Sequence, residues 1–198
     1  MRPSKRKKQS TTDTETELIC QILDGHPEQF RVLVDRYAAS LLQMVNYIVP
    51  NKEDAEEVTQ DSFLSAFESL SRYDTERASF KTWLMRIGYN TAMKKLRKQK
   101  KITFVDMDND QLYSIEDSEV DALLGEMEEE RLMLLEKAVE LLSPDDQMIL
   151  KLYYTDNLPL KEIGYVTDRT DTYLQSRLQW IRKKLARTIQ TFEKNDQR

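Results

Sequence analysis

Apolar residues recur at steps of three and four along most of this chain, which is the period of an α-helix that buries one side. The first half carries four such segments, at about residues 17–23, 27–48, 52–70 and 79–101. Pro27 stands where a helix can begin without losing a hydrogen bond, and Pro50-Asn51 ends the second segment. The pattern therefore predicts four helices in this half.

The apolar period returns at residues 132–142, and Ser143-Pro144 then forms an N-cap followed by a proline at the first helical position. A short helix at about 160–166 is separated by a tight polar turn from a longer one, which begins at Thr170 or Asp171 and runs to about residue 188. This outline predicts a helix-turn-helix, although an ordinary helical hairpin has the same outline. The composition, with 33% charged residues, four Gly and five Pro, also favours helices over sheets.

Two stretches lack the apolar period. Residues 1–16 are basic and then polar, so we predict a disordered arm there. Residues 106–130 are rich in acids and contain no Lys or Arg, which predicts an acidic linker. Because much of the net charge of −5 comes from this one segment, the overall acidity says little about basic surfaces elsewhere.

Several kinds of chemistry are disfavoured by what the chain contains. One Cys and one His exclude an internal disulfide and a zinc site of Cys and His ligands, and surface solvation explains the acidic pairs that might hold another cation. No Gly-rich phosphate loop and no set of nucleophile and base is present, so we expect neither an enzyme nor a cofactor. No apolar stretch is long enough to span a bilayer or to form a secretory signal, so we expect a cytoplasmic protein without membrane insertion.

Residues 79–101 combine cations with aromatic residues and contain no acid. The cations are Lys81, Arg86, Lys94, Lys95, Arg97, Lys98, Lys100 and Lys101. They attract phosphate, and Trp83 and Tyr89 offer flat faces for an unstacked base, which suggests single-stranded or melted nucleic acid. The alternative is an amphipathic helix whose Trp83, Leu84, Ile87 and Leu96 are core and whose cations are only solvated.

The segment at residues 52–70 carries a second polar feature, an acidic face. Glu53 and Asp54 are explained by the helix dipole, which favours acids in the first turn. Gln60 and Asp61 lie beyond that turn and need another explanation. Since no basic partner within the chain is obvious, this face indicates a basic partner molecule.

Four blocks of sequence, in this order and spacing, resemble the extracytoplasmic-function sigma factors of bacteria. They are FRVLVDRYAASLLQMVNYI, EDAEEVTQDSFLSAFESL, FKTWLMRIGYNTAMKKLRKQKK and LSPDDQMILKLYYTDNLPLKEIGYVTDRTDTYLQSRLQWIRKKL. The resemblance covers about residues 17–188 and implies an all-α fold of two small domains. The expected parts are a disordered basic arm at 1–16, a helical bundle similar to sigma region 2 at 17–102, an acidic linker at 103–130, a helix-turn-helix domain similar to sigma region 4 at 131–190, and a tail at 191–198.

By position, the resemblance assigns core polymerase binding to one face and minus-ten binding to another. The residues expected to contact core polymerase are Asp54, Glu57, Gln60 and Asp61. The loop at residues 71–78 is expected to capture a flipped base of the minus-ten element, with Tyr73, Asp74 and Arg77 as its readers. The other residues expected on the minus-ten element and the melted strand are Lys81, Trp83, Arg86, Asn90, Lys94, Lys95 and Arg97. Lys94 stands where the family usually has an acid.

For the minus-thirty-five element, the first turns of the second helix of the helix-turn-helix are expected to meet base edges. The candidates there are Arg169, Thr170, Tyr173, Gln175 and Ser176, whereas Arg177 and Arg182 are expected on phosphates. Tyr173 and Gln175 depart from the family's pattern. Trp180 and Ile181 continue the apolar period and are expected in the core.

The resemblance implies an RNA polymerase sigma factor that binds core RNA polymerase, recognises promoter DNA at the minus-thirty-five and minus-ten elements, promotes DNA melting, and has an anti-sigma factor as a further partner. It would act by binding and not by catalysis. The alternatives are a helix-turn-helix transcription regulator with a sensor domain, and a helical adaptor that binds only protein.

Overall fold

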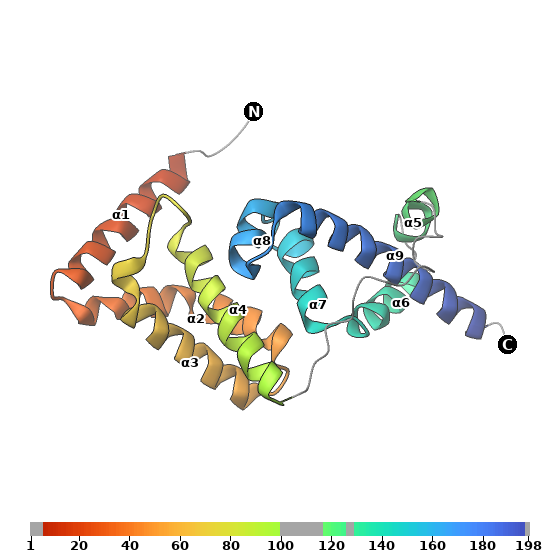
Figure 1. Cartoon of the computed structure of the whole chain (residues 1–198), viewed down its shortest axis with the longest axis horizontal. Coiled ribbons are helices and arrows are strands. Elements are labelled where there is room, and N and C mark those ends of the chain that lie inside the picture. Colours follow the sequence, from red (N-terminus) through yellow and green to blue (C-terminus); the bar gives the residue numbers. More distant parts are fainter. Residues whose placement is uncertain (1–5, 100–116, 126–128, 197–198) are drawn as a thin grey trace. The chain divides into compact units, whose positions relative to one another are not determined.

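The computed structural model describes residues 6–99, 117–125 and 129–196 (Figure 1). These residues form helices and turns and contain no strand, which confirms the all-α prediction. The chain divides into two compact units, one holding residues 1–100 and the other holding most of residues 101–198. Among the described helices, none is both long enough and apolar enough to cross a membrane.

The first unit is a bundle in which α2, α3 and α4 pack against one another (Figure 1). Its elements are α1 (Arg6–Leu23), the 3₁₀ turn η1 (Pro27–Gln29), α2 (Phe30–Ile48), α3 (Lys52–Glu68), the 3₁₀ turn η2 (Leu70–Arg72) and α4 (Phe80–Gln99). The predicted apolar stripe supplies the core, since Leu33, Met44 and Ile48 of α2 and Leu84 of α4 are buried. Leu23 and Phe67 are apolar residues of α1 and α3, but they are 51% and 40% exposed.

The disordered arm predicted for residues 1–16 is wrong from Arg6 onward, because α1 begins there. Glu15 is only 8% exposed, and its carboxylate accepts hydrogen bonds from the Tyr37 hydroxyl and, at 3.2 Å, from the Arg36 guanidinium. Glu15 is buried at a position where the helical pattern would have an apolar residue, so the apolar period did not predict this part of the helix. Residues 1–5 lie outside the described residues.

The second unit is built around the long helix α9. Its elements are α5 (Asp117–Leu124), α6 (Glu129–Glu140), α7 (Pro144–Leu150), the π-helical turn η3 (Lys151–Thr155), α8 (Leu160–Thr167) and α9 (Asp171–Asp196). Met148, Ile149, Ile163 and Ile181 are fully buried between these helices. As predicted, Ser143 caps α7: its hydroxyl oxygen accepts from the Asp146 amide at 3.2 Å, and Pro144 follows at the first helical position.

Two boundaries of this unit differ from the prediction. Part of the predicted linker at 103–130 is the helix α5, which packs on α9. Val120 of α5 is only 3% exposed. Residues 103–116 and 126–128 lie outside the described residues. The predicted tail at 191–198 is helical through Asp196, and Glu193 accepts a hydrogen bond from Arg131 at 2.8 Å. In both places helices that are distant in sequence supply the packing, which the local composition does not indicate.

Candidate functional site

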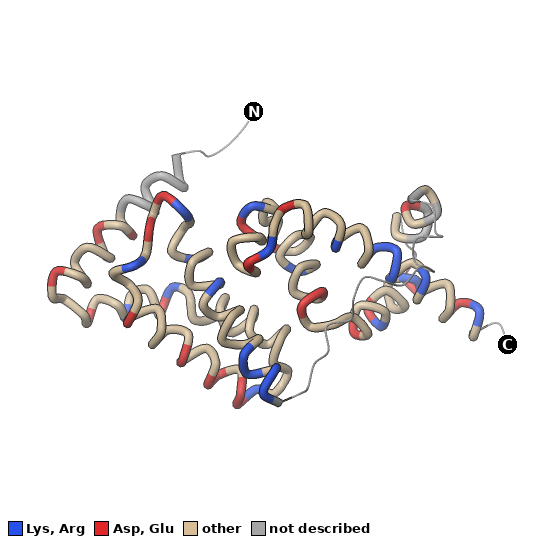
Figure 2. The backbone as a smooth tube through the Cα atoms, in the orientation of Figure 1, with Lys and Arg blue, Asp and Glu red and all other residues tan. Residues whose placement is uncertain are grey.

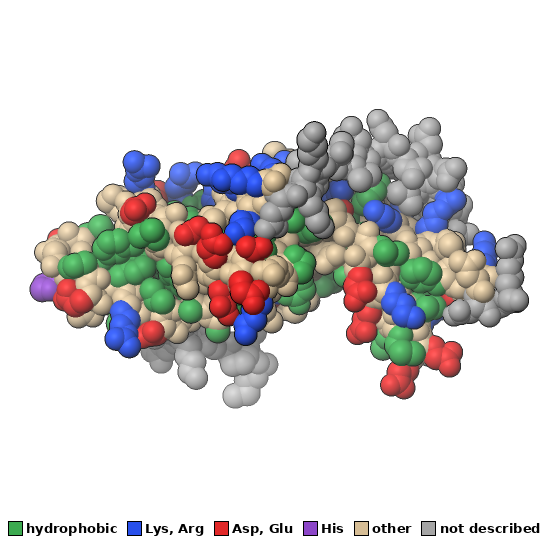
Figure 3. All heavy atoms as spheres, turned by 90° about the horizontal axis from the view of Figure 1, so that it is seen from below, with side chains coloured by type: hydrophobic (Ala, Val, Ile, Leu, Met, Phe, Trp, Pro, Cys, Tyr) green, Lys and Arg blue, Asp and Glu red, His purple; other side chains and the backbone are tan. Residues whose placement is uncertain are grey.

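The predicted polymerase-binding residues lie on α3, whose start is fixed by Asn51: its side-chain oxygen accepts from the Asp54 amide at 2.8 Å. Gln60 and Asp61 are exposed. On the same side of the helix, one and two turns further on, Leu64 is 57% exposed and Phe67 is 40% exposed. Figure 3 looks onto a face where acidic side chains gather beside hydrophobic ones. Exposed apolar side chains rimmed by polar ones mark a candidate interaction surface.

Asp54 and Glu57 have a basic partner inside the unit, contrary to the expectation that none exists. The Lys95 ammonium group of α4 lies 2.8 Å from a carboxylate oxygen of Asp54 and 2.7 Å from one of Glu57. Figure 2 shows acidic positions along α3 and basic positions near the C-terminal end of α4. Hydrogen bonds to Asp54 and Glu57 raise the pKa of Lys95 to about 12. Lys95 is therefore paired with protein carboxylates and is less available to a DNA phosphate than a solvated lysine is.

The loop at residues 71–78 is held in shape by its own hydrogen bonds. The Tyr73 hydroxyl donates to the Ala78 carbonyl at 3.1 Å, and an Asp74 carboxylate oxygen accepts from the Glu76 amide at 2.9 Å. The Arg77 amide donates to the Asp74 carbonyl at 3.2 Å. Asp74 and Arg77 are exposed, whereas the Tyr73 ring packs against Trp83 at 5.2 Å between ring centres. Burial, the largest cause, raises the pKa of Tyr73 and keeps its hydroxyl protonated.

The aromatic residues of α4 are part of the core. Trp83 and Tyr89 are 9% and 4% exposed, and Trp83 packs on Phe80 at 5.6 Å between ring centres. The prediction that their faces are open to an unstacked base is therefore wrong. Of the four residues that the alternative places in the core, Trp83, Leu84 and Leu96 are buried and Ile87 is half-buried. A helix that buries its aromatic residues against α2 and α3 has the same apolar period as one that exposes them to a base, so the period did not separate the two interpretations.

The cations of α4 remain on its surface. Lys81, Lys94, Arg97 and Lys98 are exposed and Arg86 is half-buried; Lys100 and Lys101 lie outside the described residues. Exposed Asn90 lies four residues before Lys94 and seven before Arg97, which puts these three on one side of the helix. A groove of about 320 Å³ between α3 and α4 is lined by Glu57 and Asp61 of the predicted polymerase surface and by Lys94 and Lys95 of the predicted DNA surface.

The turn between α8 and α9 has the tight geometry that a helix-turn-helix requires. Asp168 ends α8 in the left-handed conformation, and the Arg169 amide donates to the Gly164 carbonyl at 3.1 Å. The chain passes so close to α8 that a Cβ at Gly164 would lie 2.6 Å from the Arg169 carbonyl oxygen. Thr170 is the N-cap of α9, since its hydroxyl oxygen accepts from the Tyr173 amide at 3.2 Å.

Of the residues predicted to meet base edges, Thr170, Gln175 and Ser176 are exposed. Tyr173 is half-buried, and the Arg169 guanidinium lies over its ring at 5.1 Å from the ring centre. The first turns of α9 therefore present Gln175 and Ser176 openly, with Arg169 and Tyr173 stacked beside them.

Arg177 does not face solvent, so its prediction as a phosphate contact is wrong. It is 7% exposed, donates to the two Asp146 carboxylate oxygens at 2.6 and 3.0 Å, and lies over Trp180 at 4.2 Å from the ring centre. Burial, the largest single cause, lowers the pKa of Arg177, but the hydrogen bonds to Asp146 together with the charges of Asp146 and other neighbouring groups raise it overall. Arg182 pairs with Asp121 of α5 at 2.5 Å. Trp180 and Ile181 are buried, as predicted.

Two residues that organise these surfaces were missed. Glu15 had no signal in the sequence. Asp146 did have one, because Ser143 and an acid three residues later form the pattern of a capping box, and the Ser143 hydroxyl donates to an Asp146 carboxylate oxygen at 2.6 Å. Among the described residues, no group of His, Cys, Asp and Glu could hold a metal ion.

Comparisons with known proteins agree with this geometry. Residues 33–102 match the family model of Sigma-70 region 2. The chain is 27% identical to the ECF RNA polymerase sigma factor SigW of Bacillus subtilis (strain 168) over 154 residues, which cover 75% of this chain and 82% of that protein. It is 30% identical to the ECF RNA polymerase sigma-E factor of Salmonella typhimurium (strain LT2) over 186 residues, which cover 89% of this chain and 95% of that protein.

Two solved structures have a similar fold. One is CnrH in complex with the cytosolic domain of CnrY, with a TM-score of 0.59 and 20% identity over 88% of this chain and 96% of that one. The other is the sigma factor RpoE in complex with the anti-sigma factor NepR from Bartonella quintana, with a TM-score of 0.56 and 17% identity over 82% of this chain and 98% of that one. Helix order, the match to region 2 and the extent of the identity lead to one family: this chain belongs to the extracytoplasmic-function (ECF) RNA polymerase sigma factors.

Proposed function

We propose that this sigma factor recruits core RNA polymerase through the exposed side of α3 and reads promoter DNA with two separate surfaces. The observation that carries the proposal is the exposure of Gln60 and Asp61 beside exposed Leu64 and Phe67, on the unit that matches Sigma-70 region 2. Apolar side chains supply burial on binding, and the acid selects a basic partner surface. Asp54 and Glu57 belong to the same proposed surface, and both of their carboxylates pair with the Lys95 ammonium group.

The proposed minus-ten surface consists of the loop at 71–78 and the exposed side of α4. With Trp83 and Tyr89 buried, base capture rests on the loop, where Asp74 and Arg77 are exposed. Extruding a base costs a few kcal/mol, and contacts of Lys94 and Arg97 with phosphate help to offset that cost. The proposed minus-thirty-five surface is the start of α9, where Gln175 and Ser176 are exposed.

This function is one of binding, and the family in general is not catalytic. An anti-sigma factor is a proposed further partner, because one of the similar structures is a sigma factor in complex with an anti-sigma factor. A partner of that kind would compete with polymerase if it covered Leu64 and Phe67. Since the protein is proposed to bind core polymerase and promoter DNA, we propose that it acts in the cytoplasm.

Affinity for core polymerase tests the α3 surface. Replacing Gln60 by Ala and Asp61 by Lys together should weaken binding of the full chain to core enzyme, measured by fluorescence anisotropy, while circular dichroism stays unchanged. Glu17→Lys is the matched control, because it makes the same charge change at an exposed position of α1, outside the proposed α3 surface. Equal affinity of the double variant and the control would exclude this face.

Transcription tests the function as a whole. The full chain added to core enzyme should start RNA synthesis at a subset of promoters in a genomic library. A helix-turn-helix regulator would instead bind DNA without activating core enzyme, and a protein-only adaptor would show no salt-dependent DNA binding. Either result would replace the sigma function proposed above.

A further inference from the structure

One side of α9 carries a stripe that begins among the predicted base readers and continues beyond them. Gln175, Gln179, Arg182 and Ala186 follow one another at steps of four, three and four residues, so they lie along the same side of the helix. Gln175 and Gln179 are exposed, whereas Ala186 is fully buried. The stripe therefore passes from an open surface to a covered one within α9.

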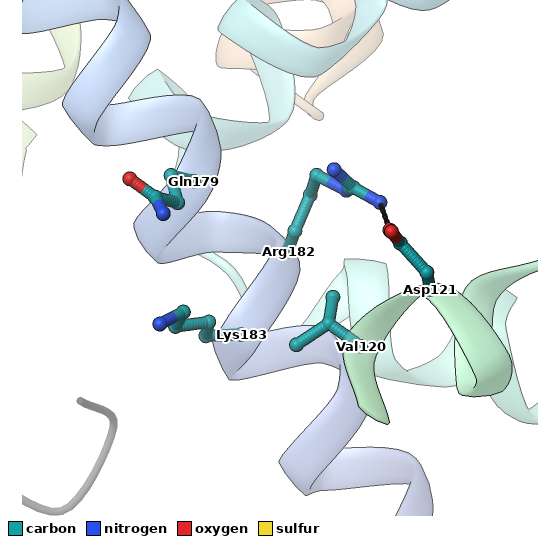
Figure 4. Close-up of a pocket in the computed structure, with 5 residues that line it drawn as sticks. All are labelled: Val120, Asp121, Gln179, Arg182 and Lys183. Atoms are coloured by element: carbon teal, nitrogen blue, oxygen red, sulfur yellow. Dashed lines mark hydrogen bonds and ion pairs between the residues drawn. The ribbon is translucent and has the colours of Figure 1, made fainter. Parts of the chain in front are cut away.

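The cover is α5, the helix found in the acidic segment. Val120 of α5 is 3% exposed and packs with Ala186, and Leu124 lies partly buried against the same contact. The Arg182 guanidinium donates to an Asp121 carboxylate oxygen at 2.5 Å. Figure 4 shows these side chains: Asp121 reaches from α5 toward Arg182, with Val120 beside α9.

The contact is of a kind that a DNA strand could replace. An Asp carboxylate offers the guanidinium the same charged oxygen acceptors that a phosphate does. The pair is open to solvent, since the side chains of Arg182 and Asp121 are 40% and 68% exposed, and such pairs contribute little to stability. A cavity of about 280 Å³ remains between the two helices, lined by Gln179 and Lys183 as well as by the pair.

We infer that α5 is an internal mask that competes with DNA phosphate for Arg182 at the end of the DNA-facing stripe of α9. The inference rests on the proposed function, because that function places α9 on DNA. Free protein binds DNA weakly while Asp121 occupies Arg182. Promoter DNA, brought close by core polymerase, displaces α5 and takes over the guanidinium.

Affinity of the full chain for a mixed-sequence DNA duplex of about three helical turns tests the mask, measured by anisotropy at low salt. Asp121→Asn and the nearly isosteric Val120→Thr should each tighten binding, by about two- to fivefold, which is the range expected for losing a weak surface contact. Glu129→Gln is the control, since it removes the same charge from an exposed position of α6 and should change affinity less than either variant. In an Arg182→Gln background, Asp121→Asn should have little further effect.

The mask is excluded if Asp121→Asn acts no more strongly than Glu129→Gln and Val120→Thr leaves affinity unchanged. A second measurement does not depend on variants. Hydrogen exchange of the backbone amides of α5 in the full chain should speed up when DNA saturates the protein, and unchanged exchange would also overturn the inference. If Asp121 controls DNA affinity as described but the chain never initiates transcription with core enzyme, the proposed function fails and the mask does not.

Discussion

Arg177 of α9 and Asp146 of α7 form a two-point ion pair in the interior of the second unit, with donor–acceptor distances of 2.6 and 3.0 Å. Asp146 is 1% exposed and Arg177 is 7% exposed. The same Asp146 bonds the Ser143 cap, so one carboxylate joins the start of α7 to the second turn of α9. The helix proposed to read DNA is thus oriented by a polar contact as well as by apolar packing.

Removing one partner of this pair should strongly destabilise the second unit. Asp146→Asn leaves the Arg177 guanidinium buried without a counter-charge, so we expect the free energy of unfolding to fall by about 3–5 kcal/mol. Denaturant unfolding followed by the fluorescence of Trp180 in a Trp83→Phe background measures this change. Glu140→Gln, at an exposed position of α6, should change the free energy of unfolding little. An equal loss of stability in both variants would contradict the assigned role of the pair.

Two glycines should respond differently to Ala. At Gly164 a Cβ meets the Arg169 carbonyl oxygen at 2.6 Å, and that backbone is fixed by the turn. At Gly88 it meets the end of the flexible Leu41 side chain at 2.5 Å. Gly164→Ala should therefore cost about 1–3 kcal/mol in unfolding free energy and Gly88→Ala less. Thermal unfolding of both variants checks this order, and the reverse order would mean that the turn is able to move.

Trp83 should behave as a core residue when DNA binds. Because it is 9% exposed and packs on Phe80 and Tyr73, iodide should quench its fluorescence poorly in a Trp180→Phe background. Adding melted promoter DNA together with core enzyme should leave that emission nearly unchanged. Strong quenching by the DNA strand would show that the ring leaves the core to stack on a base.

Tyr37 should make the first unit sensitive to alkaline pH. Burial and the hydrogen bond to Glu15 raise the pKa of Tyr37 from 10.0 to about 12, so the fold favours the protonated phenol. This contribution to stability is complete below pH 10, the pKa in the unfolded chain, and is lost as the pH rises through about 12. Denaturant unfolding at pH 9 and pH 12 should show a smaller decrease for Tyr37→Phe than for the unchanged protein, and an equal decrease would contradict the assignment.

Lys94 and Asn90, one turn apart on α4, should affect promoter binding in different ways. Lys94→Gln should weaken binding to all promoters and lower the salt slope by about one unit, since it removes one phosphate contact. Asn90→Ala should change the preference among minus-ten sequences and leave the salt slope nearly unchanged. Selection from a promoter library at two salt concentrations, with core enzyme present, measures both effects. Identical profiles for the two variants would mean that the exposed side of α4 acts only as a charged surface.

Most of the helices could be predicted from local sequence, because helix starts and stops depend on neighbouring residues. The steps of three and four predicted α2, α3 and α4, Ser143-Pro144 predicted the start of α7, and the polar turn before Thr170 predicted the break between α8 and α9. Asp61 and Gln175, which the sequence placed in predicted sites, are exposed in the structure. All of these signals lie within a few residues of the feature that they specify.

Which charged residues are open to a partner depends on how helices that are distant in sequence pack together. Lys95 reaches Asp54 across two helices, Arg177 reaches Asp146 across the second unit, and Asp121 reaches Arg182 from a segment whose composition resembles a linker. A helical period tells which residues share a side of a helix. It does not tell which side packs on another helix, or which acidic residue of that helix a cation will pair with. That choice is made when apolar surfaces pack, because a cation carried into the packed region must find a carboxylate or leave its charge without compensation.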